Sequence, residues 1–115
     1  MSRLRSDIWV AAYLRRCASD GVPAVLRRRG AAEAGAIFVI IDRLDGTAAL
    51  FSPAPQSGTV ALGIERVWLR AHDEPWIEAS AVAARLAKQI SFDPDLWLIE
   101  VEDRLGASRL DLAED

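Results

Sequence analysis

The sequence predicts a single α+β domain in which two helices pack on one face of a mostly antiparallel sheet, with the element order α-β-β-β-β-α-β. Two stretches with apolar residues at helical spacing predict the helices, and an Asp-Gly pair between two apolar runs predicts a hairpin. At 115 residues and 51% hydrophobic content, the chain is large enough for one core. We therefore assign residues 1–115 to one domain and expect the small, polar and acidic segment 106–115 to fray.

The first helix is predicted to begin near Ser6, a suitable N-cap, and Asp7 would favour the positive end of the helix dipole. Its larger side chains fall within one sector at about 100° per residue: Trp9, Val10, Tyr13, Leu14 and Cys17. Asp20 and Gly21 supply a stop signal, and Pro23 cannot continue a helix. This helix should face the core, which makes its thiol a buried structural group.

Three strands are predicted next, over Val22–Arg28, Ala36–Asp42 and Ala48–Ser52. The second is rich in β-branched residues and apolar on both faces, so it should be a central strand of the sheet. Between the second and the third, Asp45 and Gly46 are the pair that a two-residue type I′ turn prefers. A loop of that length would pair Ile41 with Leu50 across the hairpin.

A fourth strand is predicted over Val60–Arg70. Its apolar residues change parity part-way, and a bulge near Glu65 or Arg66 accounts for the change. On this register Trp68 shares the less buried face of the strand with Arg66 and Arg70. We therefore expect these three side chains to form an exposed interface, with the indole as its anchor.

A second helix is predicted after Asp73 and Pro75, because an acidic N-cap and a proline in the first turn are a start signal. One stripe of this helix is apolar: Trp76, Ala79, Ala83, Leu86, Ala87 and Ile90. The last strand is predicted over Leu96–Asp103. Because it follows a helix, it is able to pair in parallel with a neighbouring strand.

Charge is distributed unevenly along the chain. Residues 1–57 carry a net +3 and residues 58–115 a net −6. The overall charge of −3 gives no long-range attraction to nucleic acid or anionic lipid. One cysteine and one histidine exclude an internal disulfide and multi-Cys or multi-His metal sites. No apolar run approaches the roughly 20 residues of a membrane helix, and the start lacks a signal peptide's apolar stretch, so we expect a cytoplasmic protein without a membrane partner.

Three phrases of the chain carry a resemblance to a family. They are Ser6–Arg16 (SDIWVAAYLRR), Leu44–Thr47 (LDGT) and Phe92–Trp97 (FDPDLW). Over nearly its whole length, the chain resembles a small alphaproteobacterial family known only as a domain of unknown function. The resemblance implies a single-domain bacterial protein, and it brings no catalytic residue, cofactor or partner.

The densest basic cluster is a candidate phosphate site, because guanidinium groups make bidentate contacts with phosphate. It consists of Arg27, Arg28 and Arg29. The competing interpretation is that these arginines stay solvated or pair with carboxylates such as Glu100 and Glu102. Nucleic-acid surfaces usually interleave aromatic residues with basic ones, and this cluster has none. Arginine-mediated binding of nucleic acid or a phospholigand is therefore the second hypothesis.

Glu100 and Glu102 alternate on the last predicted strand, so their carboxylates should project from one face. With Asp103, and with Asp42 or Asp45, they are a candidate cation site. The element order is also that of the restriction-endonuclease-like nucleases, which is the basis of a third hypothesis, a metal-dependent nuclease. Those enzymes need a lysine two residues after an acid on a strand. The only lysine here, Lys88, falls on a predicted helix. A solvated strand face also explains the acids.

The one histidine, His72, stands beside Asp73, which is better used as a helix cap, so we expect a surface histidine rather than a general base. No catalytic constellation emerges, and no metal or cofactor is expected. The favoured interpretation is a non-enzymatic cytoplasmic domain that contacts a protein partner or a second copy of itself. A C2 homodimer is the default geometry for such self-association.

Overall fold

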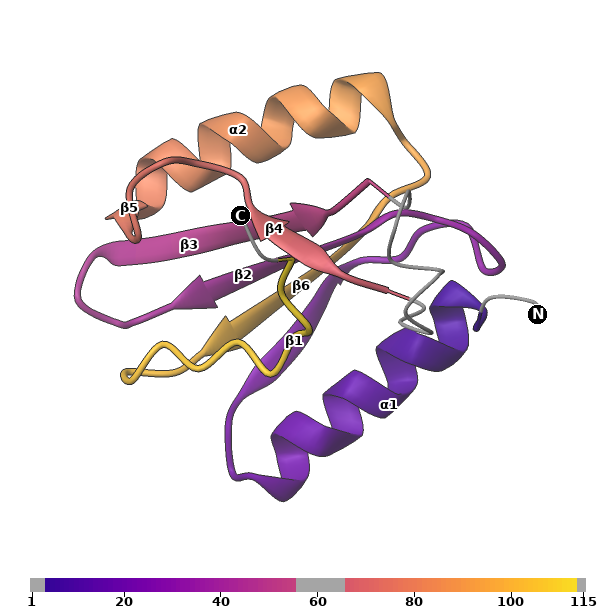
Figure 1. Ribbon diagram of the computed structural model, residues 1–115, viewed down its shortest axis with the longest axis horizontal. Helices are drawn as coiled ribbons and strands as arrows, with labels where there is room; N and C mark the ends of the chain where they lie inside the picture. Colours follow the sequence, from indigo (N-terminus) through magenta and orange to yellow (C-terminus); the bar gives the residue numbers. More distant parts are fainter. Residues whose placement is uncertain (1–3, 56–65, 114–115) are drawn as a thin grey trace.

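The computed structural model describes residues 4–55 and 66–113 of the chain. Its elements, in chain order, are α1 (Ser6–Ser19), β1 (Ala24–Arg28), β2 (Ile37–Asp42), β3 (Thr47–Pro53), β4 (Trp68–Arg70), β5 (Ile77–Glu78), α2 (Ala79–Phe92) and β6 (Trp97–Glu102). Figure 1 shows a twisted sheet between two helices, with α2 above it and α1 below it. Neither helix of the described residues is long and apolar enough to cross a membrane.

The strands form one sheet in the order β1-β6-β2-β3-β4, and β5 pairs with the start of β3. Strands β2 and β6 run parallel, and every other described pair is antiparallel. The prediction of a mostly antiparallel α+β domain is confirmed, and so is the element order, to which the structure adds the two-residue β5. Because β6 follows α2, it is able to lie between β1 and β2 and pair with both.

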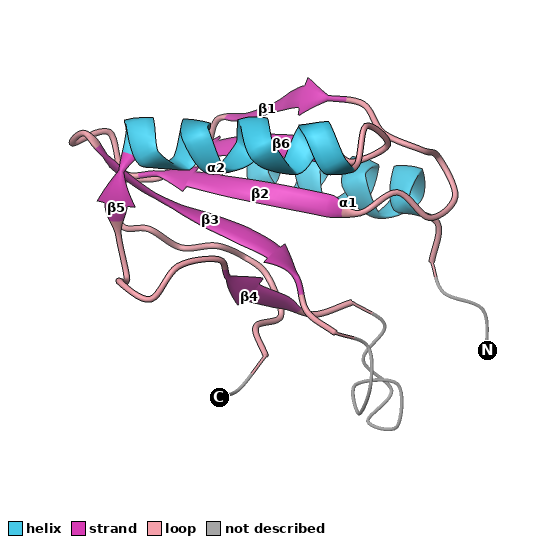
Figure 2. Cartoon of the chain, turned by 90° about the horizontal axis from the view of Figure 1, so that it is seen from above, coloured by secondary structure: helices cyan, strands magenta, loops and turns pink. Residues whose placement is uncertain are grey.

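The two helices lie on opposite faces of the sheet, and the prediction that both pack on one face is wrong. Figure 2 shows α2 in front of the sheet and α1 behind it. The α1 side contains Ile37, Val39 and Ile41, whereas the α2 side contains Phe38 and Ile40. Successive residues of a strand point to opposite faces, and β2 is buried on both. Each face therefore needs its own helix to keep it from water.

The hairpin between β2 and β3 has a longer loop than predicted. Ile41 pairs with Ala49 instead of Leu50, so the predicted register is wrong by one residue. The loop contains three residues between the last paired positions, and two of them, Leu44 (φ 64°) and Gly46 (φ 90°), have positive φ. A two-residue turn would need both positive φ values at its adjacent central positions. The pairs across the hairpin remain apolar, which keeps both faces buried.

Helix α2 begins at Ala79 rather than directly after Pro75, so the predicted helix start is wrong. The two residues of β5 pair instead with the start of β3, and the backbone N–H of Ala79 donates to the backbone oxygen of Gly46 (3.0 Å). Unpaired backbone groups at the start of β3 thus bind the residues that would have formed the first helical turn. Trp76 lies ahead of β5, off the helix, with Gly106 close against its ring.

The structure describes residues 66–70 of the predicted strand Val60–Arg70, and the last three of them form β4. Residues 60–65, with Glu65 at the expected bulge, lie outside the described residues. On the outer edge of β4, the N–H of Trp68 donates to Asp111 (2.9 Å), and its carbonyl accepts from the N–H of Ala113 (2.8 Å). Residues 106–113 are the described part of the stretch 106–115 that we expect to fray, and we call them the C-terminal segment. Two of them, Asp111 and Ala113, extend the sheet edge with these backbone bonds.

Candidate functional site

Trp68 is a core residue. Its side chain is 2% exposed, its indole N–H donates to the backbone oxygen of Ile37 (2.9 Å), and its ring lies 4.6 Å from that of Trp9. The premise that Trp68 lies on an exposed strand face is therefore wrong. The C-terminal segment and α1 cover that face. The alternation of residues along the strand does not predict either contact.

Arg66 and Arg70, which the sequence analysis groups with Trp68, lie in different environments. Arg66 is 7% exposed and donates to the backbone oxygen of Leu4 (2.8 Å) and to the hydroxyl of Ser6 (3.0 Å). The guanidinium carbon of Arg70 lies 4.9 Å from the ring centre of Phe51. The predicted cluster therefore separates into a buried arginine near α1 and a second one above an aromatic ring.

The candidate phosphate cluster also separates. Arg27 pairs with Glu100 at 2.6 Å, as the competing interpretation predicted. Arg28 donates to the backbone oxygen of Pro94 (2.7 Å), and Arg29 lies over the ring of Trp97 at 5.3 Å. Adjacent side chains on a strand point to opposite faces, so three consecutive arginines do not converge on one phosphate. Their donors serve intramolecular contacts instead.

The structure brings together only some of the carboxylates of the proposed cation site. The parallel pairing places Asp42 beside Glu102 across two strands, whereas Glu100 is occupied by Arg27. The side chain of Asp42 accepts the N–H of Leu44 (2.8 Å). Within residues 4–55 and 66–113, no three His, Cys, Asp or Glu side chains group closely enough to hold a metal ion.

His72 is buried, so the expectation of a surface histidine is wrong. Its Nε2 accepts the backbone N–H of Leu50 (3.0 Å), which leaves the proton on Nδ1 to donate to the backbone oxygen of Glu74 (2.7 Å). Both ring nitrogens hold the fold and neither is open to a substrate. Cys17 is fully buried, as expected, and burial raises the pKa of its thiol.

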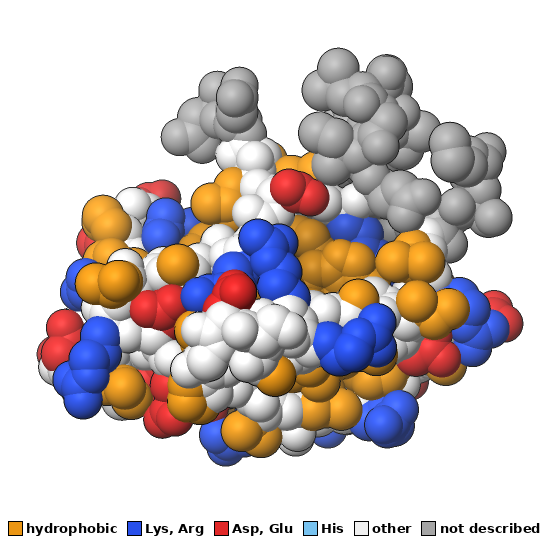
Figure 3. Space-filling view, turned by 90° about the horizontal axis from the view of Figure 1, so that it is seen from below, with side chains coloured by type: hydrophobic (Ala, Val, Ile, Leu, Met, Phe, Trp, Pro, Cys, Tyr) orange, Lys and Arg blue, Asp and Glu red, His pale blue; other side chains and the backbone are white. Residues whose placement is uncertain are grey.

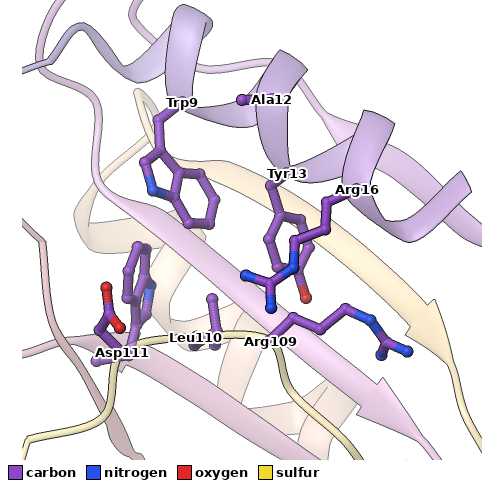
Figure 4. A pocket seen from close by; sticks show the side chains of 8 residues that line it. Trp9, Ala12, Tyr13, Arg16, Arg109, Leu110 and Asp111 are labelled. Carbon is purple, nitrogen blue, oxygen red and sulfur yellow. The ribbon is translucent and has the colours of Figure 1, made fainter. Parts of the chain in front are cut away.

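A shallow groove of about 300 Å³ runs between α1 and the C-terminal segment (Figure 4). The ring of Tyr13 stacks on that of Trp9 at 4.9 Å, and burial raises the pKa of the Tyr13 hydroxyl. Arg109 pairs with Asp20 (2.8 Å) and Asp103 (3.0 Å), and its hydrogen bond lowers the pKa of the Asp103 carboxyl. Figure 3 shows hydrophobic and basic side chains side by side on this face. The polar groups of the groove mainly bind the segment to α1.

The outer edge of β1 carries backbone groups that pair with no described residue. The N–H of Glu102 donates to the carbonyl of Pro23 (2.9 Å), which fixes the phase of the β1–β6 ladder. Alternate residues of an antiparallel ladder turn both backbone groups toward the partner, so Val25 faces β6, whereas Ala24 and Leu26 face outward. No described residue pairs with these four outward groups. Beside them, the Val25 side chain is 56% exposed.

A family model described as "Protein of unknown function (DUF1491)" matches residues 4–111. The chain belongs to the DUF1491 family. This confirms the resemblance seen in the sequence phrases, and the description of DUF1491 assigns no activity to its members.

Solved structures of similar proteins share the fold over nearly their whole length. A crystal structure of a DUF1491 family protein from Caulobacter crescentus is 34% identical, with a TM-score of 0.78, and the match covers 98% of this chain and 100% of that one. A solution structure of a protein from A. tumefaciens is also 34% identical, with a TM-score of 0.81 and 99% and 98% coverage. No protein with a curated description matches this DUF1491 chain.

Proposed function

We propose that this DUF1491 protein is a protein-interaction domain that pairs with a second copy of itself through the free edge of β1. The observation that carries the proposal is the set of four unpaired backbone groups on Ala24 and Leu26, beside the exposed side chain of Val25. An open strand edge is a template for another strand, and C2 is the commonest symmetry of homo-oligomers. The proposal retains the expectation of a cytoplasmic protein.

A two-fold axis at Val25 gives a self-complementary register. It sets the two β1 strands antiparallel, with Ala24 of each copy opposite Leu26 of the other. These positions become hydrogen-bonded pairs, and their outward groups form four N–H···O bonds. The two Val25 side chains form the central non-hydrogen-bonded pair, the type in which side chains approach most closely. The two sheets then become one continuous sheet.

The basic residues after Leu26 are compatible with this register. Arg27 would stand opposite Pro23 of the second copy, so like charges do not face each other. Glu100 already neutralises Arg27 within each chain. The irregularity between Leu26 and Arg28 ends the regular edge at that point, which restricts strand addition to this short register.

The oligomeric state in solution tests the proposal. Size-exclusion chromatography with light scattering should give twice the chain mass of 12.6 kDa at about 100 μM protein, a concentration that populates a dimer whose dissociation constant is about 10 μM or lower. Ala24→Pro removes only an outward N–H, so the β1–β6 ladder is kept, and it should give a monomer. Val25→Lys places like charges at the axis and should do the same.

Phe92→Lys is the matched control. Phe92 is 74% exposed at the end of α2, so the variant removes an exposed apolar side chain that is not part of β1 and should leave the dimer intact. Circular dichroism of each variant establishes that it is folded. A wild-type monomer at that concentration, or a dimer that survives both Ala24→Pro and Val25→Lys, would show that the proposal is wrong.

A further inference from the structure

A pocket of about 430 Å³ opens between β4, the residues that follow it and the end of the C-terminal segment. The buried rings of Phe51 and Trp68 line it, together with the side chains of Leu69 and Leu112, which are 37% and 47% exposed. Among the described residues, Arg70 is the one arginine or lysine of its lining. The pocket thus combines an apolar surface with a single permanent cation. It lies at the opposite end of the sheet from β1 and does not depend on the proposed dimer.

The guanidinium of Arg70 lies over aromatic rings, and no carboxylate of the described residues forms an ion pair with it. Its carbon lies 4.9 Å from the ring centre of Phe51 and 5.6 Å from that of Trp76. Its Nε is buried without an acceptor, and no carboxylate of the described residues lies within salt-bridge distance. A partly desolvated guanidinium with a fixed plane is stabilised by an anion that accepts its N–H groups.

The backbone of Arg70 adds two unpaired groups at the same place. The N–H of Ala71 donates to the carbonyl of Leu50 (2.9 Å), so by alternation the N–H and C=O of Arg70 turn away from β3. The C-terminal segment bonds to this outer edge at Trp68. In the part of the chain that the structure describes, no backbone group pairs with Arg70 on that edge. The side chain and the backbone N–H therefore both offer donors to an anion.

We infer that this pocket binds a monocarboxylate that carries an apolar group. One guanidinium forms a bidentate pair with one carboxylate, and the carboxylate of Asp73, which also lines the pocket, repels a phosphate dianion more strongly than a monoanion. His72 offers no free donor to the ligand because both its ring nitrogens bind backbone groups. Leu69 and Leu112 offer contact area to the apolar group. A small organic acid and the C-terminus of a peptide share this chemistry.

An NMR titration of the full chain with hexanoate tests the inference. Saturable shifts are expected at the indole N–H of Trp76 and at the amides of Arg70 and Leu112 by about 10 mM ligand, the range of a millimolar dissociation constant. Hexylamine, with the same chain and the opposite charge, and inorganic phosphate should give none there. In a second arm, a short peptide ending in leucine is compared with its C-terminal amide. Tighter binding of the acid peptide than of hexanoate assigns the site to a polypeptide terminus, and the reverse assigns it to a small acid.

Substitution of Arg70 distinguishes binding at this pocket from non-specific contact of the ligand with the protein. Arg70→Gln should weaken hexanoate binding about tenfold or more, and Arg70→Lys, which keeps the charge without the planar fork, should weaken it less. Arg15→Gln, at an exposed position of α1, is the matched control and should bind as wild type. Thermal melts establish that each variant is folded. An absent hexanoate response, an equal response to hexylamine, or unchanged affinity in Arg70→Gln overturns the inference.

Discussion

The hydroxyl of Tyr13, in the middle of α1, donates a hydrogen bond to the backbone oxygen of Ser108 at 2.7 Å. The two residues are 95 positions apart, so this bond ties the first helix to the C-terminal segment. Arg109 adds contacts to Asp20 and Asp103. These side chains hold the segment beside α1, from where its backbone reaches β4.

Removing the hydroxyl should loosen this attachment. Tyr13→Phe is expected to lower the free energy of unfolding by about 1 kcal/mol, because one hydrogen bond is lost and the ring still stacks on Trp9. The amide of Trp68, which donates to Asp111, should exchange with solvent faster. Urea unfolding and amide hydrogen exchange measure the two effects. Unchanged exchange at Trp68 would mean that the segment docks without this bond.

Alkaline pH should destabilise the fold through the same hydroxyl. Burial raises the pKa of Tyr13 above its ordinary value of 10.0. Above that pH the unfolded chain ionises while the folded hydroxyl stays neutral, so the free energy of unfolding should hold below pH 10 and fall as the pH rises further. Urea unfolding between about pH 8 and 11 measures it. Tyr13→Phe should lose less stability over this range, and an equal fall in both proteins would place the cause elsewhere.

Acid should release the ion pair at Asp103. The hydrogen bond from Arg109 holds the pKa of this carboxyl below its ordinary value of 3.8. The stabilisation is therefore present above that value and is lost as the pH falls through the lower pKa of the folded state. Asp103→Asn should lower the free energy of unfolding at neutral pH by about 1 kcal/mol and flatten its fall in acid. Asp95→Asn, at an exposed carboxyl, is the control and should keep the acid response of the wild type.

A side chain at position 30 should not fit, because the backbone of Asp95 and Leu96 lies close to Gly30. A Cβ there would overlap the backbone oxygen of Asp95 and lie 2.6 Å from the backbone carbon of Leu96. Gly30→Ala is expected to lower the free energy of unfolding by about 1 to 3 kcal/mol, since the overlap is with backbone that must move. Gly21→Ala, at φ +73° in open space, tests strain without overlap. An equal or smaller loss for Gly30→Ala, measured by urea unfolding, would contradict the steric explanation.

The element order was predictable because local patterns determine it. The β-branched run of β2 predicts a central strand, and the apolar stripe of α1 predicts a core-facing helix. Helical spacing shows which side of a helix is apolar and does not show which face of the sheet it covers. The two-sided burial of β2 contains that information, because Val39 and Ile40 need separate covers. The start of α2 was mispredicted because pairing with β3 takes up the residues after Pro75.

The candidate sites were less predictable because distant segments build them. The alternation of residues along β4 predicted that Trp68 lies on an exposed face, but the C-terminal segment covers that face. The rings beside Arg70 come from Phe51 and Trp76, and no local spacing relates these three residues. The pairing of Arg27 with Glu100 was predictable from the general tendency of arginines to stay solvated or to pair with available carboxylates.

The position of β6 has a consequence for how the chain folds. This strand lies between β1 and β2, although it is the last of the described strands to leave the ribosome. Until it emerges, β1 has no partner strand, and β2 carries apolar side chains with one edge open. The pairings of β1 and β2 with β6 therefore wait for the end of synthesis, and contacts between distant segments favour slow folding. A nascent chain that stops before residue 97 should be a substrate for chaperones rather than a smaller domain.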